Sequence, residues 1–227
     1  MPITAILFDL DGTLVDSNEF HVEVWQKIFA RHGHEIGVEA IRGQIGKGGD
    51  LLIPALLPAT GEATRKAMSA LHGEIFGAEY LRRVQPFAGA HDLLSHVHAA
   101  GQRIVLASSA KQAELDHYAE LLGAGGLVEA MVCADDVEHS KPAPDIFAAA
   151  LKTLGVPAGE AVMIGDTPYD IEGAAKCGVA TIGLRSGGFP DVALAGAVAI
   201  FDDVAALLAG YAESPLANQE AAAERSR

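Results

Sequence analysis

The sequence is poor in cysteine and in long apolar runs, and each shortage excludes a class of protein. Its 227 residues include only Cys133 and Cys177, with no CxxC pair. That favours free thiols in a reducing compartment over a disulfide framework. Apolar runs such as AVMIG are far shorter than the ~20 residues that span a bilayer, and no signal-peptide pattern begins the sequence. We therefore expect a cytoplasmic protein with no membrane partner.

Basic side chains are also scarce. The 16 Lys and Arg are outnumbered by 30 Asp and Glu, which gives a formal net charge of −14. A charge of this sign opposes binding to nucleic acid, so we expect no nucleic-acid partner. The nine histidines show no spacing typical of a metal site, and His91, His96 and His98 are expected on a helix surface.

The sequence does contain a change of hydrophobic period near residue 84. Between residues 17 and 84 the apolar positions follow helical spacing, and Ser17 is expected to cap the first helix. Further on, helices alternate with short apolar segments. Together with residues 3–8, the predicted strands are 104–107, 131–134, 161–164, 180–184 and 198–201.

This alternation predicts an α/β fold, with a Rossmann-like parallel sheet as core and an inserted all-helical domain. We expect the core to comprise residues 1–16 and 85–212. The helical insert, a name used below for residues 17–84, interrupts it. Residues 213–227 are polar and show no core-facing pattern, so we expect a frayed or disordered tail without a catalytic role.

The stretch ILFDLDGTLVDS places Asp9 and Asp11 at the end of the first predicted strand. Alternation along a strand points both carboxylates the same way, and their repulsion is costly unless a cation, a shared proton or a reaction offsets it. A turn would explain the Asp-Gly pair. It would not explain an acidic residue inside the apolar run.

Polar residues also follow the other predicted strands. Ser108 and Ser109 follow the second, Lys141 lies near the end of the third connection, and Asp166 and Asp170 follow the fourth. Ligands bind beyond the carboxyl ends of parallel strands, so these residues are expected to converge. Separately, the serines could be a helix cap and the lysine a solvated loop residue. Jointly, they suit Mg²⁺ and a phosphoryl group.

The motifs DLDGT, LASS, SKPAPDIF and GDTPYD, in this order, resemble those of the haloacid dehalogenase superfamily, in its phosphatase and phosphomutase branch. The helical insert lies where that family has its cap domain. The resemblance implies that Asp9 is a nucleophile that forms an aspartyl-phosphate. It implies that Asp11 begins protonated, protonates the leaving oxygen and later activates water.

The resemblance also implies roles for the other motif residues. Ser108 and Ser109 would bind the phosphoryl group, and Lys141 would neutralise charge on it and on Asp9. Asp9, Asp166 and the backbone carbonyl of Asp11 would bind Mg²⁺. Asp170 would act behind them, through water or Lys141.

Within the helical insert, three side chains are candidates for contact with the reacting groups. His21 could orient Asp11 or lie on the surface of its helix. The segment RGQIGKGGD is glycine-rich, which allows a mobile loop, and its Arg42 and Lys47 could meet the substrate when the insert closes. The same segment could instead be a plain connection between helices.

The resemblance predicts a Mg²⁺-dependent phosphatase of a small phosphorylated metabolite, acting as a monomer or homodimer. A sugar-phosphate mutase like β-phosphoglucomutase is the alternative, although Gly49 stands where those mutases carry an arginine. A member that binds a ligand without catalysis is the third possibility. It would be indicated by the loss of a motif residue, and none is lost.

Overall fold

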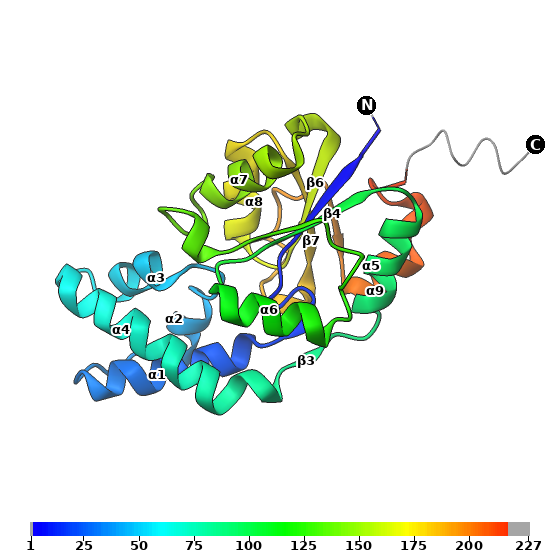
Figure 1. Cartoon of the computed structure of the whole chain (residues 1–227). Helices are drawn as coiled ribbons and strands as arrows, with labels where there is room; N and C mark the ends of the chain where they lie inside the picture. The colour runs from blue at the N-terminus through cyan, green and yellow to red at the C-terminus, as the bar shows by residue number, and fades with distance from the viewer. Residues whose placement is uncertain (1, 218–227) are drawn as a thin grey trace, which may run out of the picture.

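The apolar segments that alternate with helices form a six-stranded sheet in the order β5-β4-β1-β6-β7-β8 (Figure 1). All its strand pairs are parallel. The computed structural model describes residues 2–217. The strands of this sheet are β1 Ala5–Phe8, β4 Arg103–Ala107, β5 Ala130–Val132, β6 Ala161–Gly165, β7 Ala180–Leu184 and β8 Ala199–Phe201. The predicted α/β fold class is therefore confirmed.

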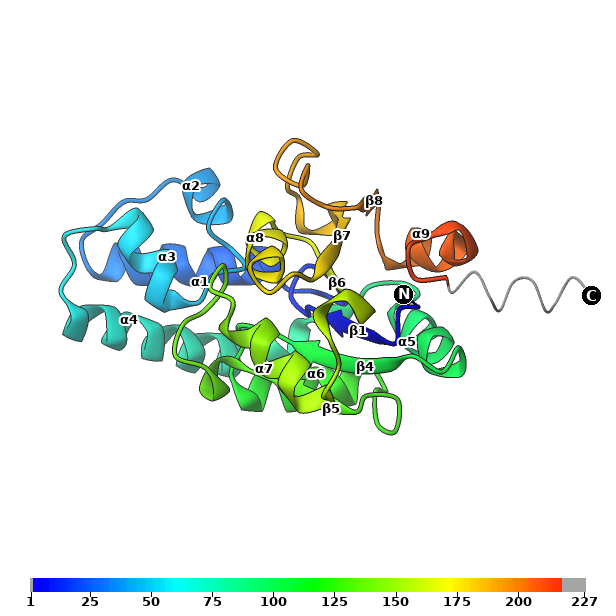
Figure 2. The same cartoon turned by 90° about the horizontal axis from the view of Figure 1, so that it is seen from above.

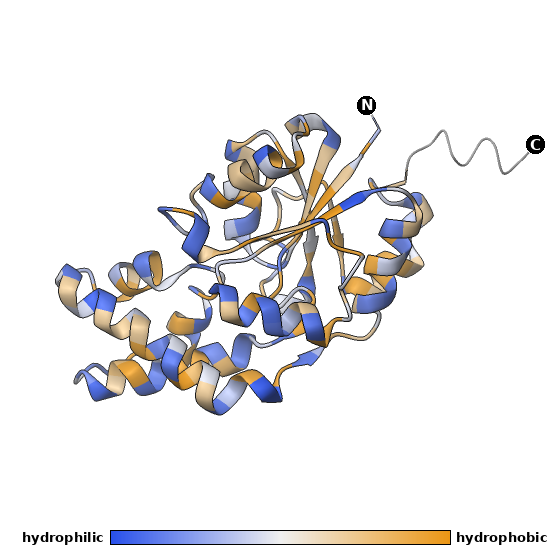
Figure 3. Ribbon diagram, in the orientation of Figure 1, coloured by the Kyte–Doolittle hydropathy of each residue, from blue (hydrophilic) through white to orange (hydrophobic). Residues whose placement is uncertain are grey.

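The side chains of β1 are completely buried on both faces of the sheet. Ile6 and Phe8 pack into one hydrophobic cluster, and Ala5 and Leu7 into the other. Figure 3 shows the central strands as predominantly apolar. A strand covered on both sides reads as a continuous apolar run, which is why β1 was recognisable in the sequence.

Helices cover both faces of the sheet (Figure 2). On one face α7, Asp145–Leu154, and α8, Pro168–Lys176, pack over β1, β4 and β6. The helices α5, Ala90–Ala99, and α6, Gln112–Leu121, with the short α9, Val204–Ala209, contribute to the cluster on the other face. As expected, the three histidines of α5 are exposed.

The helical insert is entered and left through two paired segments. β2, Val15–Asp16, is antiparallel to β3, Gln85–Pro86. The helices between them are α1 Asn18–Arg31, α2 Val38–Arg42, α3 Gly49–Leu56 and α4 Glu62–Ile75, followed by a π-helical turn Phe76–Tyr80 and a 3₁₀ turn Leu81–Arg83. The pairing brings both connections together beside the sheet. The division into two domains stays a prediction.

The strand predicted over 131–134 is shorter at its end than expected. β5 ends at Val132, and Ala134–Asp136 form a 3₁₀ turn. The carboxylate of Asp136 accepts a hydrogen bond of 2.9 Å from the backbone N–H of Cys133. A side-chain acceptor thus takes the place of a neighbouring strand.

The expected tail is wrong for its first residues, because Leu216 is completely buried in the larger hydrophobic cluster. Its backbone carbonyl accepts a hydrogen bond from the Gln102 side chain at 2.9 Å. One apolar residue in a polar segment has no periodicity, so no pattern in the sequence predicts this burial. The part of this prediction that concerns residues 218–227 lies outside the described residues. Within residues 2–217, every helix is too short or too polar to traverse a bilayer.

We predict that Leu216→Ala lowers the free energy of unfolding by about 2–5 kcal/mol, because it removes a fully buried side chain and leaves a cavity. Chemical denaturation measures the change. Val192→Ala is the matched control, since Val192 is 83% exposed and its truncation should cost less than about 0.5 kcal/mol. Equal stability of both variants would contradict the packing of Leu216.

Candidate active site

A buried lysine joins two of the predicted acidic residues at the end of the sheet. The Nζ of Lys141 lies 2.6 Å from Asp9 Oδ1 and 2.8 Å from Asp170 Oδ1. It also donates a hydrogen bond of 2.9 Å to the carbonyl of Ala107, the last residue of β4. Burial lowers the pKa of Lys141, but the charges of Asp170 and Asp9 outweigh it and raise that pKa. Lys141 therefore stays an ammonium ion.

Asp166, after β6, completes a cluster of three buried carboxylates. One oxygen from each of Asp9, Asp166 and Asp170 lies within 4.8 Å of the others. Thr13 donates to Asp166 Oδ1 at 2.9 Å, and Asn18 donates to its Oδ2 at 3.2 Å. Burial and then the charges of Asp9 and Asp170 still raise the pKa of Asp166 well above its usual value. One ammonium does not balance three carboxylates.

The donor set fits a hard divalent cation. Mg²⁺ is bound by carboxylate and carbonyl oxygens, and a cation between Asp9 and Asp166 would offset their repulsion. The backbone also approaches Asp166 closely. A Cβ atom on Gly187 would lie 1.8 Å from Asp166 Oδ2, and one on Gly12 2.3 Å from it. Glycine at both positions leaves Asp166 room that larger residues would fill.

Asp11 has its own set of partners, separate from Lys141. Its Oδ1 accepts hydrogen bonds from Ser17 Oγ at 2.5 Å and Tyr118 Oη at 3.2 Å, and lies 3.1 Å from His21 Nε2. The predicted capping role of Ser17 is wrong, because this hydroxyl makes no capping hydrogen bond to α1. A carboxylate is the stronger acceptor, so the hydroxyl turns to it.

His21 lies against Asp11, as one of the two sequence interpretations proposed. Its ring stacks on Phe76 with 4.0 Å between centroids, and its Nδ1 lies 3.3 Å from His72 Nε2. Burial lowers the pKa of His21, but Asp11 more than compensates and raises it. His72 and Tyr118 were not foreseen, because their positions depend on how α4 and α6 pack against α1.

Asp9 and Asp11 differ in pKa in the direction opposite to that expected. The resemblance implies an ionised Asp9 and a protonated Asp11, but Asp9 has the higher pKa. Burial raises the pKa of Asp9 to about 7 in spite of Lys141. Burial also acts on Asp11, but the charge and hydrogen bonds of His21, with those of Ser17 and Tyr118, lower its pKa overall. The expected order needs a cation beside Asp9 to favour its carboxylate. It also needs the proton shared by Asp11 and His21 to pass to Asp11.

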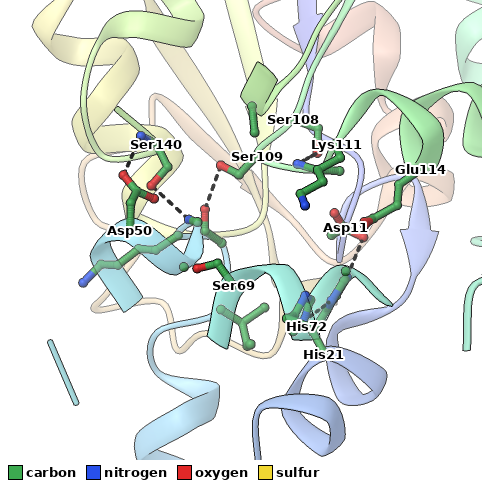
Figure 4. A pocket seen from close by; sticks show the side chains of 18 of the residues that line it. Asp11, His21, Asp50, Ser69, His72, Ser108, Ser109, Lys111, Glu114 and Ser140 are labelled. Atoms are coloured by element: carbon green, nitrogen blue, oxygen red, sulfur yellow. Dashed lines mark hydrogen bonds and ion pairs between the residues drawn. The ribbon is translucent and has the colours of Figure 1, made fainter. Parts of the chain in front are cut away.

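These groups open into a cavity of about 690 Å³ between the core and the helical insert (Figure 4). Ser108 and Ser109 line it from the core, and Ser69 and His72 line it from α4. The Oγ of Ser108 accepts a hydrogen bond of 3.1 Å from the N–H of Ala110, which leaves its own hydrogen available to a ligand.

The glycine-rich segment closes one side of this cavity. The N–H of Gly48 donates to Ser140 Oγ at 3.0 Å, and the N–H of Ser140 donates to Asp50 Oδ2 at 3.1 Å (Figure 4). Ser140 precedes Lys141 in the chain. The helical insert thus holds the backbone next to the buried lysine.

The two basic candidates of this segment have different positions. Lys47 lines the cavity, where its Nζ lies 2.6 Å from Gln44 Oε1 and 4.3 Å from the ring centroid of Tyr169. Arg42 is not among the lining residues. Its guanidinium pairs with Glu19 at 2.8 Å and with Glu39. The structure therefore does not bring Arg42 to the site.

The chain is similar to known hydrolases over most of its length. Residues 3–178 match the family model described as haloacid dehalogenase-like hydrolase. A phosphoglycolate phosphatase of Rhodospirillum rubrum is 30% identical over 89% of this chain and 88% of that protein. Pyrophosphatase PpaX of Halalkalibacterium halodurans is 27% identical over 80% of this chain and 83% of that protein.

A solved structure supports the same relationship. The crystal structure of a hydrolase from Pseudomonas syringae superposes with a TM-score of 0.87 at 28% identity, and covers 95% of this chain and 100% of the other. The likeness therefore includes the helical insert as well as the sheet.

We predict that Lys141→Met lowers the free energy of unfolding by about 3–5 kcal/mol, because it leaves Asp9 and Asp170 buried without their cation. Denaturation in a chelating buffer measures this. Lys152→Met is the control, since Lys152 is exposed and forms no ion pair among the described residues. A loss below about 1 kcal/mol for Lys141→Met would refute the buried pairing.

Proposed function

Because the chain belongs to the haloacid dehalogenase-like hydrolase family and is a phosphatase of small phosphorylated substrates, we propose that it acts through an aspartyl-phosphate on Asp9 and requires Mg²⁺. The observation that carries this proposal is that Asp9 and Asp11, two residues apart, have entirely different partners. Asp9 is held by Lys141, whereas Asp11 is held by His21. Two carboxylates in different environments can act as nucleophile and as acid.

In the proposed first step, an oxygen of Asp9 attacks phosphorus as the bond from phosphorus to the leaving oxygen breaks. Asp11 donates a proton to the leaving oxygen. His21 Nε2, 3.1 Å from Asp11 Oδ1, is placed to give Asp11 that proton. Water then attacks the phosphorus of the aspartyl-phosphate while Asp11 accepts a proton from the water. The bond between phosphorus and the Asp9 oxygen breaks, which releases phosphate and restores the Asp9 carboxylate. Lys141 and Ser108 would stabilise charge on the phosphoryl oxygens.

Asp9, Asp166 and the backbone carbonyl of Asp11 would hold Mg²⁺, which when bound supplies positive charge to the phosphoryl group. Asp170 keeps Lys141 in place from the opposite side, at 2.8 Å. The cytoplasmic location and the monomeric or homodimeric state stay predictions.

The space around Gly49 favours a phosphatase over a mutase. A Cβ atom on Gly49 would lie 2.2 Å from Ser69 Oγ and 3.1 Å from the Trp25 ring. A larger side chain there would have to turn the Ser69 hydroxyl away and shift the Trp25 ring slightly, so the site is fitted to glycine. Gly49 itself cannot offer the arginine that a β-phosphoglucomutase-like enzyme is expected to use. A non-catalytic role would leave the buried, repelling carboxylates without a purpose.

We predict Mg²⁺-dependent phosphate release from members of a panel of phosphorylated metabolites, including phosphoglycolate, sugar phosphates and nucleotides. Asp9→Asn should lower it by at least about 10³-fold, because the amide cannot act as nucleophile. The matched variant Asp92→Asn, on the exposed surface of α5, should keep full activity. Interconversion of sugar-phosphate isomers without release would indicate the mutase. Activity of Asp9→Asn equal to wild type would refute the proposal.

We predict that saturating Mg²⁺ raises the melting temperature, because binding at 100 times Kd stabilises a folded protein by about 2.7 kcal/mol. Asp166→Asn should abolish the rise, and Asp92→Asn should keep it. Differential scanning calorimetry measures the shift without any substrate. An unchanged shift in Asp166→Asn would place the metal elsewhere.

A further inference from the structure

The cavity continues past the reacting groups, along α4. Glu62, Arg65 and Lys66 line it from the first half of that helix, and Val137 and Glu138 line it from the core. Arg65 precedes His72 by seven residues, which is about 10 Å along a helix. Because His72 contacts His21 beside Asp11, the cavity has a region about two helical turns from the reaction centre.

Arg65 is the unusual residue of this region. Its Nε is buried and has no hydrogen-bond partner, and Arg65 forms no ion pair within residues 2–217. A buried donor without a partner is destabilising, more so when it is charged. Glu62, on the same helix, pairs with Lys66 at 2.7 Å, which lowers the pKa of Glu62, and the charge of Arg65 is near enough to help lower it. Glu62 makes no hydrogen bond to Arg65 Nε, however. Arg65 is only half-buried and lines the cavity, so an anion there would balance its charge.

The rest of the cavity lining also suits an anionic ligand. Ser69, one turn further along α4, presents a hydroxyl to the cavity (Figure 4). Lys47 and Lys111 line the same cavity, and neither forms an ion pair among the described residues. Acids are present too. Asp50 is engaged by Ser140, and Glu114 and the exposed Glu138 are further acids of the same lining.

We propose that Arg65 binds a second anionic group of the substrate, so that the enzyme prefers phosphate monoesters whose leaving group carries a carboxylate or phosphate several bonds from the ester. The inference rests on the proposed function and deepens it. A planar guanidinium matches either group by two parallel hydrogen bonds. The volume of about 690 Å³ has room for a substrate much larger than two carbons.

Two matched substrate pairs test the inference. In each pair the carbon chain has the same length and one member adds an anionic group at the far end: glucose 6-phosphate with 6-phosphogluconate, and fructose 6-phosphate with fructose 1,6-bisphosphate. In wild type we expect kcat/KM to be at least about 10-fold higher for the member with two anionic groups in at least one pair. Phosphate release with Mg²⁺ gives the ratio.

The variant Arg65→Met keeps much of the side-chain length and removes the charge, so that ratio should fall about 10- to 100-fold. Arg65→Lys should restore part of it, because the charge returns without the paired hydrogen bonds. Arg31→Met is the matched control. Arg31 is an exposed arginine of α1 outside the cavity, and its loss should leave the ratio unchanged.

The outcomes separate the two proposals. Release from no member of the wider panel, these four substrates included, or release that persists in Asp9→Asn, would overturn the proposed function and the inference with it. Asp9-dependent release from the panel but from none of these four would overturn the inference alone. Release that depends on Asp9, with no preference in either pair, would overturn the inference alone. A preference that is unchanged in Arg65→Met would also overturn the inference alone.

Discussion

The site buries several carboxylates at one end of a sheet, and it depends on positive charge and hydrogen bonds that offset the repulsion between them. Within residues 2–217, Lys141 is the one ammonium that contacts them, and it bridges Asp9 and Asp170. It does not reach Asp166, which relies on the neutral donors Thr13 and Asn18. The remaining excess of negative charge is what suits the cluster to a divalent cation and to the phosphoryl group that such a cation attracts.

The parallel sheet makes this concentration of charge possible. Asp9 and Asp166 follow β1 and β6, which are neighbours in the sheet, and the carbonyl that receives Lys141 ends β4 on the other side of β1. Strands buried on both faces are held rigidly by their hydrogen bonds and by apolar packing. The side chains just past their ends are therefore fixed in position.

The helical insert contributes the second half of the site. His21 reaches Asp11 from α1, and His72 meets His21 from α4. Gly48 and Asp50 hold Ser140 next to Lys141, so the insert contacts the machinery at two points (Figure 4). In the proposed mechanism, a substrate in the cavity would lie between these contacts, with its leaving group toward the insert and its phosphate toward the core.

The sequence by itself determined the sheet and the candidate core residues. Apolar runs mark buried strands, and parallel strands bring their carboxyl ends to one edge, so Asp9, Lys141 and Asp166 could be placed together from their order alone. Only the tertiary structure decided that His72 and Arg65 of α4 and Tyr118 of α6 lie at the site. It also decided that Arg42 lies outside the cavity and that Leu216 is buried. These outcomes depend on how helices pack across distant parts of the chain, and helical periodicity gives a buried face without naming its partner.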